Sequence, residues 1–255
     1  MMSASRIARW HETSEVSALG KFEIHVWKIN LAVPPAEASR LRNFLSAAEC
    51  EQAARFRFAH DQRRFVVRRA ILRRLVAASL ETKPEAVHFK ILSHGKPQVF
   101  GQESSDGLRF SCSHSADLAL VTLARGRELG VDLEQHRPLT DAQKLAGKFF
   151  SASEISELAA LPQLLKMPGF FNGWTRKEAF LKAIGLGLSF PLDRFSVTLT
   201  PDQSAALLSV NDDHKAAEKW TMISLDVRPD YSAALVFVGK TTGIQLFNWN
   251  SQTLY

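Results

Sequence analysis

Two acidic side chains alternate with apolar ones in the segment Gly130-Val131-Asp132-Leu133-Glu134. Residues two apart in a β-strand point to the same face, so Asp132 and Glu134 would project together while Val131 and Leu133 face the core. Neighbouring carboxylates repel one another unless something positive lies between them. A hard divalent cation such as Mg²⁺, which takes oxygen ligands, would supply that charge. Two solvated acids on an edge strand are the simpler alternative, and the pattern alone leaves both open.

A second charged segment runs from Trp174 to Ala183 and has the spacing of one helix face. Glu178 and Lys182 are four residues apart and share that face, with Trp174 one turn earlier. An ordinary surface ion pair, worth only about 0.2–0.5 kcal/mol, would explain the two charges. Cationic side chains beside an acid would also suit a phosphate bound through a metal ion.

The segment from Phe110 to Ser115 predicts a strand that runs into a small polar turn. Its hydroxyls, its amides and the imidazole of His114 could donate to phosphate oxygens, or they could form a plain hydrogen-bonded turn. A serine–histidine nucleophile pair is disfavoured, because base and nucleophile usually meet through space rather than as sequence neighbours.

Two further features are compatible with phosphate binding but are less specific. Gly95-Lys96-Pro97 is a loop tripeptide without the glycine spacing of a Walker-type loop. Six arginines lie on one predicted helix, where they would form a solvated basic face or include one or two phosphate contacts: Arg63, Arg64, Arg68, Arg69, Arg73 and Arg74.

Strands and helices alternate along the chain and must position these segments. Ser46–Glu49 and Ser151–Glu154 have the pattern of capping boxes that open helices. Pro162 and Pro168-Gly169 predict breaks, so that Asn172 would cap a helix ending at Gly185. The predicted helices cover about 61–79, a stretch from about 140, and 172–185; the predicted strands are 22–26, 87–92, 108–113, 118–124, 129–134, 195–199, 220–227 and 232–238.

The predicted elements occur in a similar order in two halves that divide near residue 126, which indicates an α+β duplication. We expect residues 1–20 to form a flexible tail, 21–125 the N-terminal half, and 126–255 the C-terminal half with the metal ligands. The length of 255 residues suits one large domain or two packed smaller ones. Length and doubled order together favour a monomer.

The composition limits the class of protein. Hydrophobic residues make up 45% and charged residues 23%, which is ordinary for a globular protein. No signal peptide and no run of about 18 apolar residues is visible, and the two cysteines form no disulfide framework, so a cytoplasmic, non-membrane protein is expected. The net charge of +6 favours an anionic partner, whether nucleic acid, a phosphorylated cofactor or an acidic protein.

In this order, four motifs resemble those of the Sfp-type 4′-phosphopantetheinyl transferases: Gly95-Lys96-Pro97, Ser113-His114-Ser115, Gly130 to Glu134, and Trp174 to Ala179. The Trp and Lys-Glu-Ala form resembles the subgroup with a broad carrier-protein range. The resemblance covers roughly residues 55–186. It departs at Ser111, where the family usually has asparagine, and the shorter side chain would alter the geometry near the phosphates.

The resemblance implies two similar α/β halves related by pseudo-twofold symmetry, with the active site in the cleft between them. It also implies that Asp132, Glu134 and Glu178 hold Mg²⁺; Mn²⁺ would accept the same oxygen ligands. Asp132, Glu178 and Lys182 would be the catalytic residues. Glu178 would act as general base toward the acceptor serine, and Lys182 would offset charge on the pyrophosphate.

Coenzyme A binding would involve five further positions by the same resemblance. Lys96 and Pro97 would lie near the adenine, Ser113 and His114 would contact phosphates, and Arg64 would meet the 3′-phosphate. Lys182 would contact coenzyme A as well.

The implied reaction moves the phosphopantetheine arm of coenzyme A to a serine of an apo carrier protein (acyl, peptidyl or polyketide carrier) and releases adenosine 3′,5′-bisphosphate. Two alternatives stay open: a relative that binds coenzyme A without turnover, and a basic nucleic-acid-binding protein that uses the arginine helix. The absence of a recognised nucleic-acid module and the presence of all three carboxylates favour the transferase, and hence no nucleic-acid partner.

Overall fold

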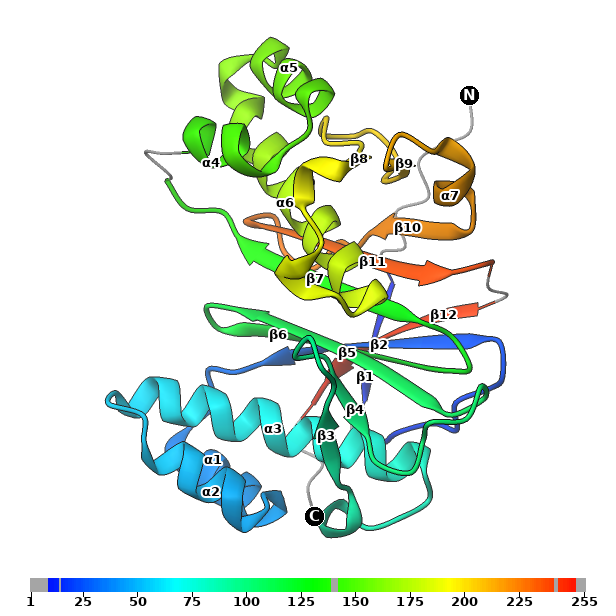
Figure 1. The fold of residues 1–255 in the computed structure, drawn as a ribbon. Coiled ribbons are helices and arrows are strands. Elements are labelled where there is room, and N and C mark those ends of the chain that lie inside the picture. Colours follow the sequence, from blue (N-terminus) through cyan, green and yellow to red (C-terminus); the bar gives the residue numbers. More distant parts are fainter. Residues whose placement is uncertain (1–8, 14, 139–141, 241–242, 251–255) are drawn as a thin grey trace.

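Two β-sheets meet at the centre of the molecule, and helices cover their outer faces (Figure 1). This computed structural model describes residues 9–13, 15–138, 142–240 and 243–250. Its helices are α1 (Pro35–Leu41), α2 (Ala47–Ala54), α3 (Ala59–Ser79), α4 (Ala142–Phe149), α5 (Ala152–Ala160), α6 (Gln163–Ile184) and α7 (His214–Glu218). The strands are β1 (Trp10–Thr13), β2 (Glu23–Asn30), β3 (Phe89–Ile91), β4 (Pro97–Val99), β5 (Leu108–Ser115), β6 (Leu118–Arg125), β7 (Leu129–Gln135), β8 (Phe195–Val197), β9 (Leu207–Val210), β10 (Trp220–Ser224), β11 (Tyr231–Val238) and β12 (Gly243–Trp249).

The two larger sheets repeat one arrangement of strands. In the first, the order is β1-β12-β2-β6-β5, and in the second it is β10-β11-β7. The strands β2, β6 and β5 are antiparallel neighbours, as are β7, β11 and β10. In the first set, the long helix α3 follows β2 and precedes β5 and β6 in sequence. In the second set, α6 likewise follows β7 and precedes β10 and β11. The mixed α+β class predicted from the sequence is confirmed.

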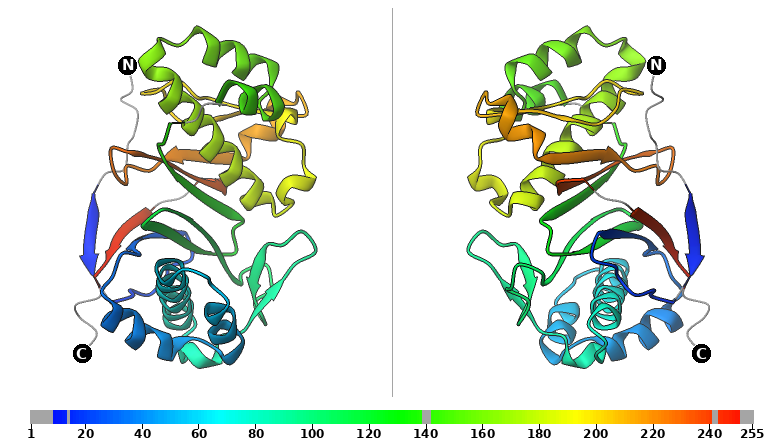
Figure 2. Two further views of the ribbon diagram at one scale, coloured as in Figure 1. Left: turned by 90° about the vertical axis from the view of Figure 1, so that its left-hand side faces the viewer. Right: turned by 90° about the vertical axis from the view of Figure 1, so that its right-hand side faces the viewer.

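Three of the apolar clusters among the described residues lie in layers on and between the two large sheets. One core lies between α3 and the first sheet, and it includes Trp27, Ile71 and Val121. A second lies between the two sheets, where residues of β2, β6 and β12 meet residues of β7 and β11. The third lies between the second sheet and α6, whose Phe180 stands T-shaped to Trp220 and tilted to Phe195. The side views show the same sequence of layers (Figure 2).

The last described strand, β12, belongs to the first sheet, although it follows the second half of the chain in sequence. β12 inserts between β1 and β2 in the first sheet, in parallel register with both. The predicted boundaries differ here, because residues 10–13 form a paired strand rather than a tail and residues 243–249 belong to the first sheet. Pairing on β2 satisfies backbone groups that an edge strand would leave open, and Phe247 stacks on Trp27 at 4.4 Å. Residues 1–8 of the predicted tail lie outside the described part of the chain.

Helix α6 begins nine residues, about two and a half turns, earlier than the sequence pattern predicted. It begins at Gln163 and continues through Pro168, so Asn172 is an interior residue and not a cap. Pro168 leaves the carbonyl of Leu164 without its helix donor, and Leu164 is 90% exposed, so water can reach this turn. A Cβ at Gly169 would lie 2.5 Å from Leu161 Cδ1, so a larger residue there would require the leucine side chain to move.

Other local predictions are confirmed. Ser46 with Glu49 and Ser151 with Glu154 form complete capping boxes at α2 and α5. Gly185 ends α6 in the left-handed conformation at φ 72°, which glycine adopts at little cost. The predicted start of a helix near residue 140 falls outside the described residues, and α4 is described from Ala142. Among the residues described, no helix combines the length and apolar content that a membrane span requires.

Candidate active site

Asp132 is the most constrained carboxylate of the predicted site. It lies on β7 and is 4% exposed. Its Oδ1 accepts hydrogen bonds from Ser113 Oγ and from Lys182 Nζ, each at 2.6 Å. Its Oδ2 is buried and has no partner among the described residues. An unpartnered buried carboxylate oxygen is costly, which marks this atom as a place where a ligand would be stabilising.

Three serines of β5 join the two halves at this point. Ser111 Oγ accepts from the backbone N–H of Val131 at 3.1 Å, and Ser115 Oγ donates to Glu134 Oε2 at 2.8 Å. With Ser113 on Asp132, these positions two apart face β7 along the whole carboxylate segment. We call them the serine seam. The departure at Ser111 therefore keeps a hydrogen bond, to the backbone of the second half.

Glu134 and Glu178 complete a group of three coupled carboxylates. Burial raises the pKa of Glu134, and the charge of Asp132 raises it further. Burial also raises the pKa of Glu178, with added repulsion from Asp132 and Glu134. Burial alone would lower the pKa of Lys182, but Asp132 and Glu178 outweigh it and the net shift is upward. One ammonium thus faces three acids, so the ionised site carries excess negative charge.

Two features of this site would favour a divalent cation: its excess negative charge and its oxygen donors. Within the described residues, no three His, Cys, Asp or Glu side chains are gathered closely enough to hold a metal ion. Lys182 occupies one side of Asp132, while Oδ2 stays open. Carboxylate oxygens of this kind are the ligands that Mg²⁺ prefers. Asp132, Glu134 and Glu178 thus supply the kind of oxygen donor that a hard cation prefers, but the three carboxylates do not converge in the described structure.

Close contact between α6 and β7 sets the position of Glu178 and Lys182. A Cβ on Gly130 would lie 2.1 Å from the carbonyl oxygen of Ala179 and 2.4 Å from the amide nitrogen of Ala183. Any side chain at residue 130 would therefore push the helix away from the strand. The glycine of the strand motif is explained by this approach, which brings the helical charges over the carboxylates.

Lys177, next to Glu178, anchors the same helix from the other side. Its side chain is 0% exposed, and Nζ donates to the carbonyls of Leu192 and Phe195 at 2.8 and 2.6 Å. It also pairs with Glu154, the capping-box residue of α5, at 2.8 Å. Burial lowers the pKa of Lys177, and Glu154 acts against that shift. These contacts tie α6 to α5 and to the segment that precedes β8.

Trp174 and the neighbouring phenylalanines are part of the hydrophobic packing. Trp174 stacks on Phe170 and stands T-shaped to Phe149 at 5.6 Å, in the core shared by α4, α5 and α6. Phe150 is buried in the same cluster. The tryptophan of the motif thus supports α6 and does not face the carboxylates.

A cavity of about 260 Å³ opens beside Glu178 and Lys182, between the halves. It is bounded by the loop before β4, by β5 and by the end of α6. Its lining residues are His94, Gly95, Lys96, Pro97, Phe110, Ser111, Cys112, Glu178, Leu181, Lys182, Gly185 and Gly187. The structure therefore brings together Lys96, Pro97, Glu178 and Lys182, which lie far apart in sequence.

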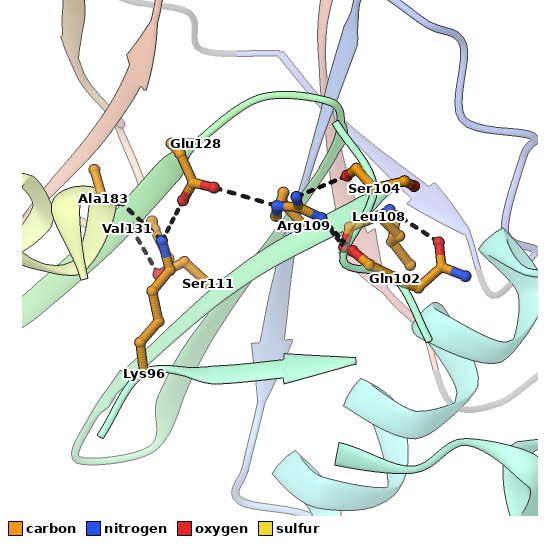
Figure 3. A network of polar contacts seen from close by, with 9 residues as sticks. All are labelled: Lys96, Gln102, Ser104, Leu108, Arg109, Ser111, Glu128, Val131 and Ala183. Atoms are coloured by element: carbon orange, nitrogen blue, oxygen red, sulfur yellow. Dashed lines mark hydrogen bonds and ion pairs between the residues drawn. The ribbon is translucent and has the colours of Figure 1, made fainter. Parts of the chain in front are cut away.

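Lys96 is held by a polar network that sequence reasoning missed (Figure 3). Its Nζ donates to Glu128 Oε2 at 2.6 Å and to the carbonyl of Ala183 at 2.9 Å. Glu128 also accepts from Arg109 Nε at 3.2 Å. The network ties the β3–β4 hairpin to the end of α6. Glu128 precedes the strand motif by two residues, and nothing in its spacing indicates this role.

Removing the charge of Glu128 should increase the local opening of the loop with Lys96, which lines the cavity. In Glu128→Gln we expect faster amide hydrogen exchange in residues 93–96, because Lys96 loses its carboxylate partner. The control is Glu103→Gln, which breaks the ion pair to Lys90 on the same hairpin but away from α6. Equal exchange in wild type and Glu128→Gln would contradict a fastening role for Glu128.

Two other predicted phosphate contacts, His114 and Arg64, are not among the residues that line this cavity. His114 lies at the end of β5 with its side chain partly exposed, and its Nδ1 accepts from Arg68 Nη1 at 3.2 Å. Burial by surrounding protein and the charges of Arg68, Lys182 and Arg64 lower the pKa of His114 to about 4. Arg64 donates to Asp117 at 2.9 Å and pairs with Asp61.

The arginine helix is not a uniform solvated face. Arg69 and Arg73 both pair with the buried Glu49 of α2, and Arg73 donates to the carbonyls of Pro84 and Val87. Three of its six arginines, Arg64, Arg69 and Arg73, thus form ion pairs within the fold. This finding weakens the hypothesis of a nucleic-acid-binding helix, which needs a free row of cations.

Comparison with known proteins supports what the motifs indicated. Residues 128–236 match the profile of the 4′-phosphopantetheinyl transferase superfamily, and residues 34–125 match that of 4′-phosphopantetheinyl transferase, N-terminal. The chain is 36% identical over 217 residues to 4′-phosphopantetheinyl transferase HetI of Nostoc sp., covering 85% of this chain and 88% of that protein.

Two Bacillus proteins are also similar. The chain is 32% identical to 4′-phosphopantetheinyl transferase psf-1 of Bacillus pumilus, covering 78% of this chain and 81% of that protein. It is 28% identical to 4′-phosphopantetheinyl transferase Sfp of Bacillus subtilis, covering 78% of this chain and 84% of that protein. The chain therefore belongs to the 4′-phosphopantetheinyl transferase superfamily, among the Sfp-type enzymes that its motifs predicted.

Proposed function

We propose that this transferase moves the phosphopantetheine arm of coenzyme A to a serine hydroxyl of an apo carrier protein and releases adenosine 3′,5′-bisphosphate. The observation that carries the proposal is the arrangement of Asp132, Glu178 and Lys182 beside a cavity between the halves. Phosphoryl transfer needs positioning and charge neutralisation more than covalent help, and this site offers both.

Coenzyme A is proposed to lie along the cavity and its extension. A second hollow of about 300 Å³ adjoins the first and shares Lys96, Pro97 and Gly185 with it. The adenine would lie against Lys96 and Pro97, whose loop is fixed by Glu128. The pyrophosphate would lie at Lys182, where the positive charge and the carboxylates meet.

The chemical step forms one bond to phosphorus and breaks another. The serine oxygen of the carrier attacks the phosphorus that bears the pantetheine arm, and the bond from that phosphorus to the oxygen shared with the adenosine bisphosphate breaks. Glu178 accepts the serine proton, which its raised pKa favours. Lys182 offsets the negative charge that develops on the leaving phosphate.

We propose Asp132, Glu134 and Glu178 as the residues that would hold Mg²⁺, with Mn²⁺ as an ion of similar ligand preference. The unpartnered Oδ2 of Asp132 and the excess negative charge support this assignment. When bound, such a cation neutralises charge on phosphate oxygens. Ser113 and Ser115 orient two of the carboxylates through their hydroxyls.

We further propose that the halves are related by a pseudo-twofold axis. Support comes from the matching strand orders β2-β6-β5 and β7-β11-β10, each with a long helix between its first and second strands in sequence. Because one chain supplies both sides of the cavity, a monomer suffices for the proposed activity. The cytoplasmic location and the absence of a nucleic-acid partner stay predictions from the sequence.

Labelling of a purified apo carrier protein tests the proposed function. With coenzyme A and Mg²⁺, we expect the carrier to gain the mass of one phosphopantetheine group, measured by intact-protein mass spectrometry. A carrier whose acceptor serine is replaced by alanine serves as the control. Binding of coenzyme A without any mass gain, across acyl, peptidyl and polyketide carriers, would favour the binding-only alternative.

A further inference from the structure

A pocket of about 520 Å³ lies beside the outer strand of the second sheet, away from the cavity proposed for coenzyme A. One wall is formed by β10 and the turn that follows it, and the other by the loop 201–205. The first half of α6 and His136 complete it. We call it the edge pocket. It shares no lining residue with the first cavity, so the proposed chemical step gives it no role.

Strand β10 has a strand partner on one side of its backbone, because it is the outer strand of the order β10-β11-β7. The N–H of Leu225 donates to the carbonyl of Ala233 on β11. Hydrogen bonding alternates along antiparallel strands, so the backbone groups of Met222 and Ser224 point away from β11. No described residue forms a hydrogen bond with these backbone groups, and both residues line the edge pocket.

This edge carries none of the features that prevent pairing with another chain. Natural proteins place charged residues, prolines or bulges on exposed edges, but residues Trp220–Ser224 include no charge and no proline, and their register with β11 is regular. The free donors and acceptors repeat at every second residue, roughly 7 Å apart. An extended peptide backbone matches that spacing, and it would add to the sheet as a further strand.

A buried positive charge lies in the same pocket. Arg176 is 3% exposed, and its guanidinium donates to neutral oxygens of Thr198, Gln203 and Ser224. Among the described residues it forms no ion pair with a carboxylate, and the charge of Glu157 acts on it from beyond contact distance. Its contact with the carbonyl of Gln203, at 3.4 Å, is long for a hydrogen bond. An acidic side chain from a partner would replace that contact and compensate the charge.

The exposed charges around the pocket restrict the kind of partner. Asp202, Asp226 and Arg228 line it, and all three are exposed. Two carboxylates at this place would repel a nucleic acid or a run of acidic residues. A peptide with a single acidic residue between neutral ones avoids that repulsion and can still reach Arg176.

The inner end of the edge pocket adjoins the proposed catalytic carboxylates. Ser232 lines the pocket and lies directly opposite Glu134 in the register of β7 and β11, so their side chains share one face of the sheet. The hydroxyl of Ser232 donates to Asn172 Oδ1 at 2.8 Å and contacts His136 Nε2 at 2.9 Å. A chain bound in the pocket therefore lies next to the place where the acceptor serine must enter.

We infer that the free edge of β10 binds an extended segment of the acceptor protein, outside the carrier domain itself, as an added strand with one acidic side chain on Arg176. The inference rests on the proposed function, which supplies the protein partner. The segment raises the affinity for the acceptor by adding a second point of attachment, and it takes no part in the chemical step.

Labelling kinetics test the inference with one apo carrier in two forms, in its parent protein with the flanking segments and as an isolated domain. We expect kcat/KM to be about 10-fold higher for the parent form, the scale of one to two added hydrogen bonds. Ser224→Pro should abolish this advantage, because proline lacks the outward N–H and its ring obstructs strand addition. Both forms of the carrier are labelled at the same enzyme concentration.

Ser224→Ala is the matched control, since it loses the same hydroxyl contact with Arg176 but keeps the backbone N–H. It should retain the advantage of the parent form to within about 3-fold, the effect of one neutral hydrogen bond. Both variants should label the isolated carrier domain at the wild-type rate, because Ser224 lies outside the proposed catalytic group.

Short synthetic peptides that cover the flanking segments identify the bound part, and fluorescence anisotropy measures their dissociation constants with wild-type protein. Replacing the acidic residue of the bound peptide by its amide should weaken binding about 10-fold, as for loss of a hydrogen bond to a charged group. The peptide is changed rather than Arg176, which joins α6 to Thr198 and Gln203 within the fold. This measurement decides the question if Ser224→Pro does not fold.

Equal kcat/KM for the two carrier forms, or equal losses in Ser224→Pro and Ser224→Ala, would overturn the inference and leave the proposed function in place. Unchanged affinity of the amide peptide would also overturn it. A dimer of this protein that Ser224→Pro abolishes, measured by analytical ultracentrifugation, would assign the edge to a second copy instead. A wild-type protein that labels neither form would overturn the proposed function, and this inference with it.

Discussion

Asp132→Asn is expected to lower the rate of carrier labelling by about 10³-fold, the scale of losing one group that stabilises transition-state charge. The substitution keeps the shape of the side chain but removes the charge that holds Lys182 at 2.6 Å. It also removes the acidic character of the buried, unpartnered Oδ2. Labelling is measured by mass at saturating coenzyme A and carrier, so that the change reports on kcat.

Asp226→Asn is the matched control for this variant. Asp226 is exposed, and its contact with Trp10 is made by its backbone carbonyl, which the substitution leaves in place. We also expect Mg²⁺ to raise the melting temperature of wild type and to raise that of Asp132→Asn far less, because a cation that binds the folded state stabilises it. Labelling by Asp132→Asn within a few-fold of wild type would contradict the proposed role of Asp132.

Glu178→Gln is the second variant for which a large loss is expected, about 10²- to 10⁴-fold in labelling rate, as for removal of a general base. Glutamine preserves the length of the side chain and the packing of α6 on β7. It cannot accept the serine proton at Oε. Glu218→Gln, on the exposed short helix α7, is the charge-matched control.

Without metal, the same variant should be more stable than wild type, in a pH-dependent way. Burial and the charges of Asp132 and Glu134 raise the pKa of Glu178 above 4.5 in the folded protein. The folded state therefore holds this proton more tightly than the unfolded state, and ionisation destabilises the fold as the pH rises through that folded pKa. Glu178→Gln avoids this cost at pH 8, and its advantage should shrink below pH 4.5.

Urea denaturation at pH 8 and pH 4 in the presence of a chelator measures this difference in the free energy of unfolding. A variant that keeps wild-type activity and shows no stability gain at pH 8 would contradict both the proton-accepting role and the repulsion among the three carboxylates. Loss of activity with no change in stability would leave the base assignment and reject the electrostatic explanation.

Local patterns in the sequence predicted most of the elements that carry the site. The alternation around Asp132 predicted its strand, and the spacing of Glu178 and Lys182 predicted one helix face. These patterns succeed because strand and helix periodicity are set by neighbours in the chain. The prediction failed at Pro168, which lies inside α6 instead of ending a preceding segment.

Long-range pairing could not be predicted in the same way. Nothing in residues 243–249 indicates that they complete the first sheet beside β2, because strand pairing depends on which edges the rest of the fold leaves open. The serine seam is an intermediate case. Its spacing of two along β5 was visible in the sequence, but its partners on β7 were not.

The motifs along the chain were enough to identify the family, the strand with Asp132 and Glu134, and the helix with Glu178 and Lys182. Which charges are compensated depends on the folded arrangement. Arg64 and Arg68 occupy one helix and look alike in sequence, yet Asp117 neutralises the first and no described carboxylate neutralises the second. Counter-charges come from residues far along the chain, so which arginines are compensated can be seen only in the folded protein.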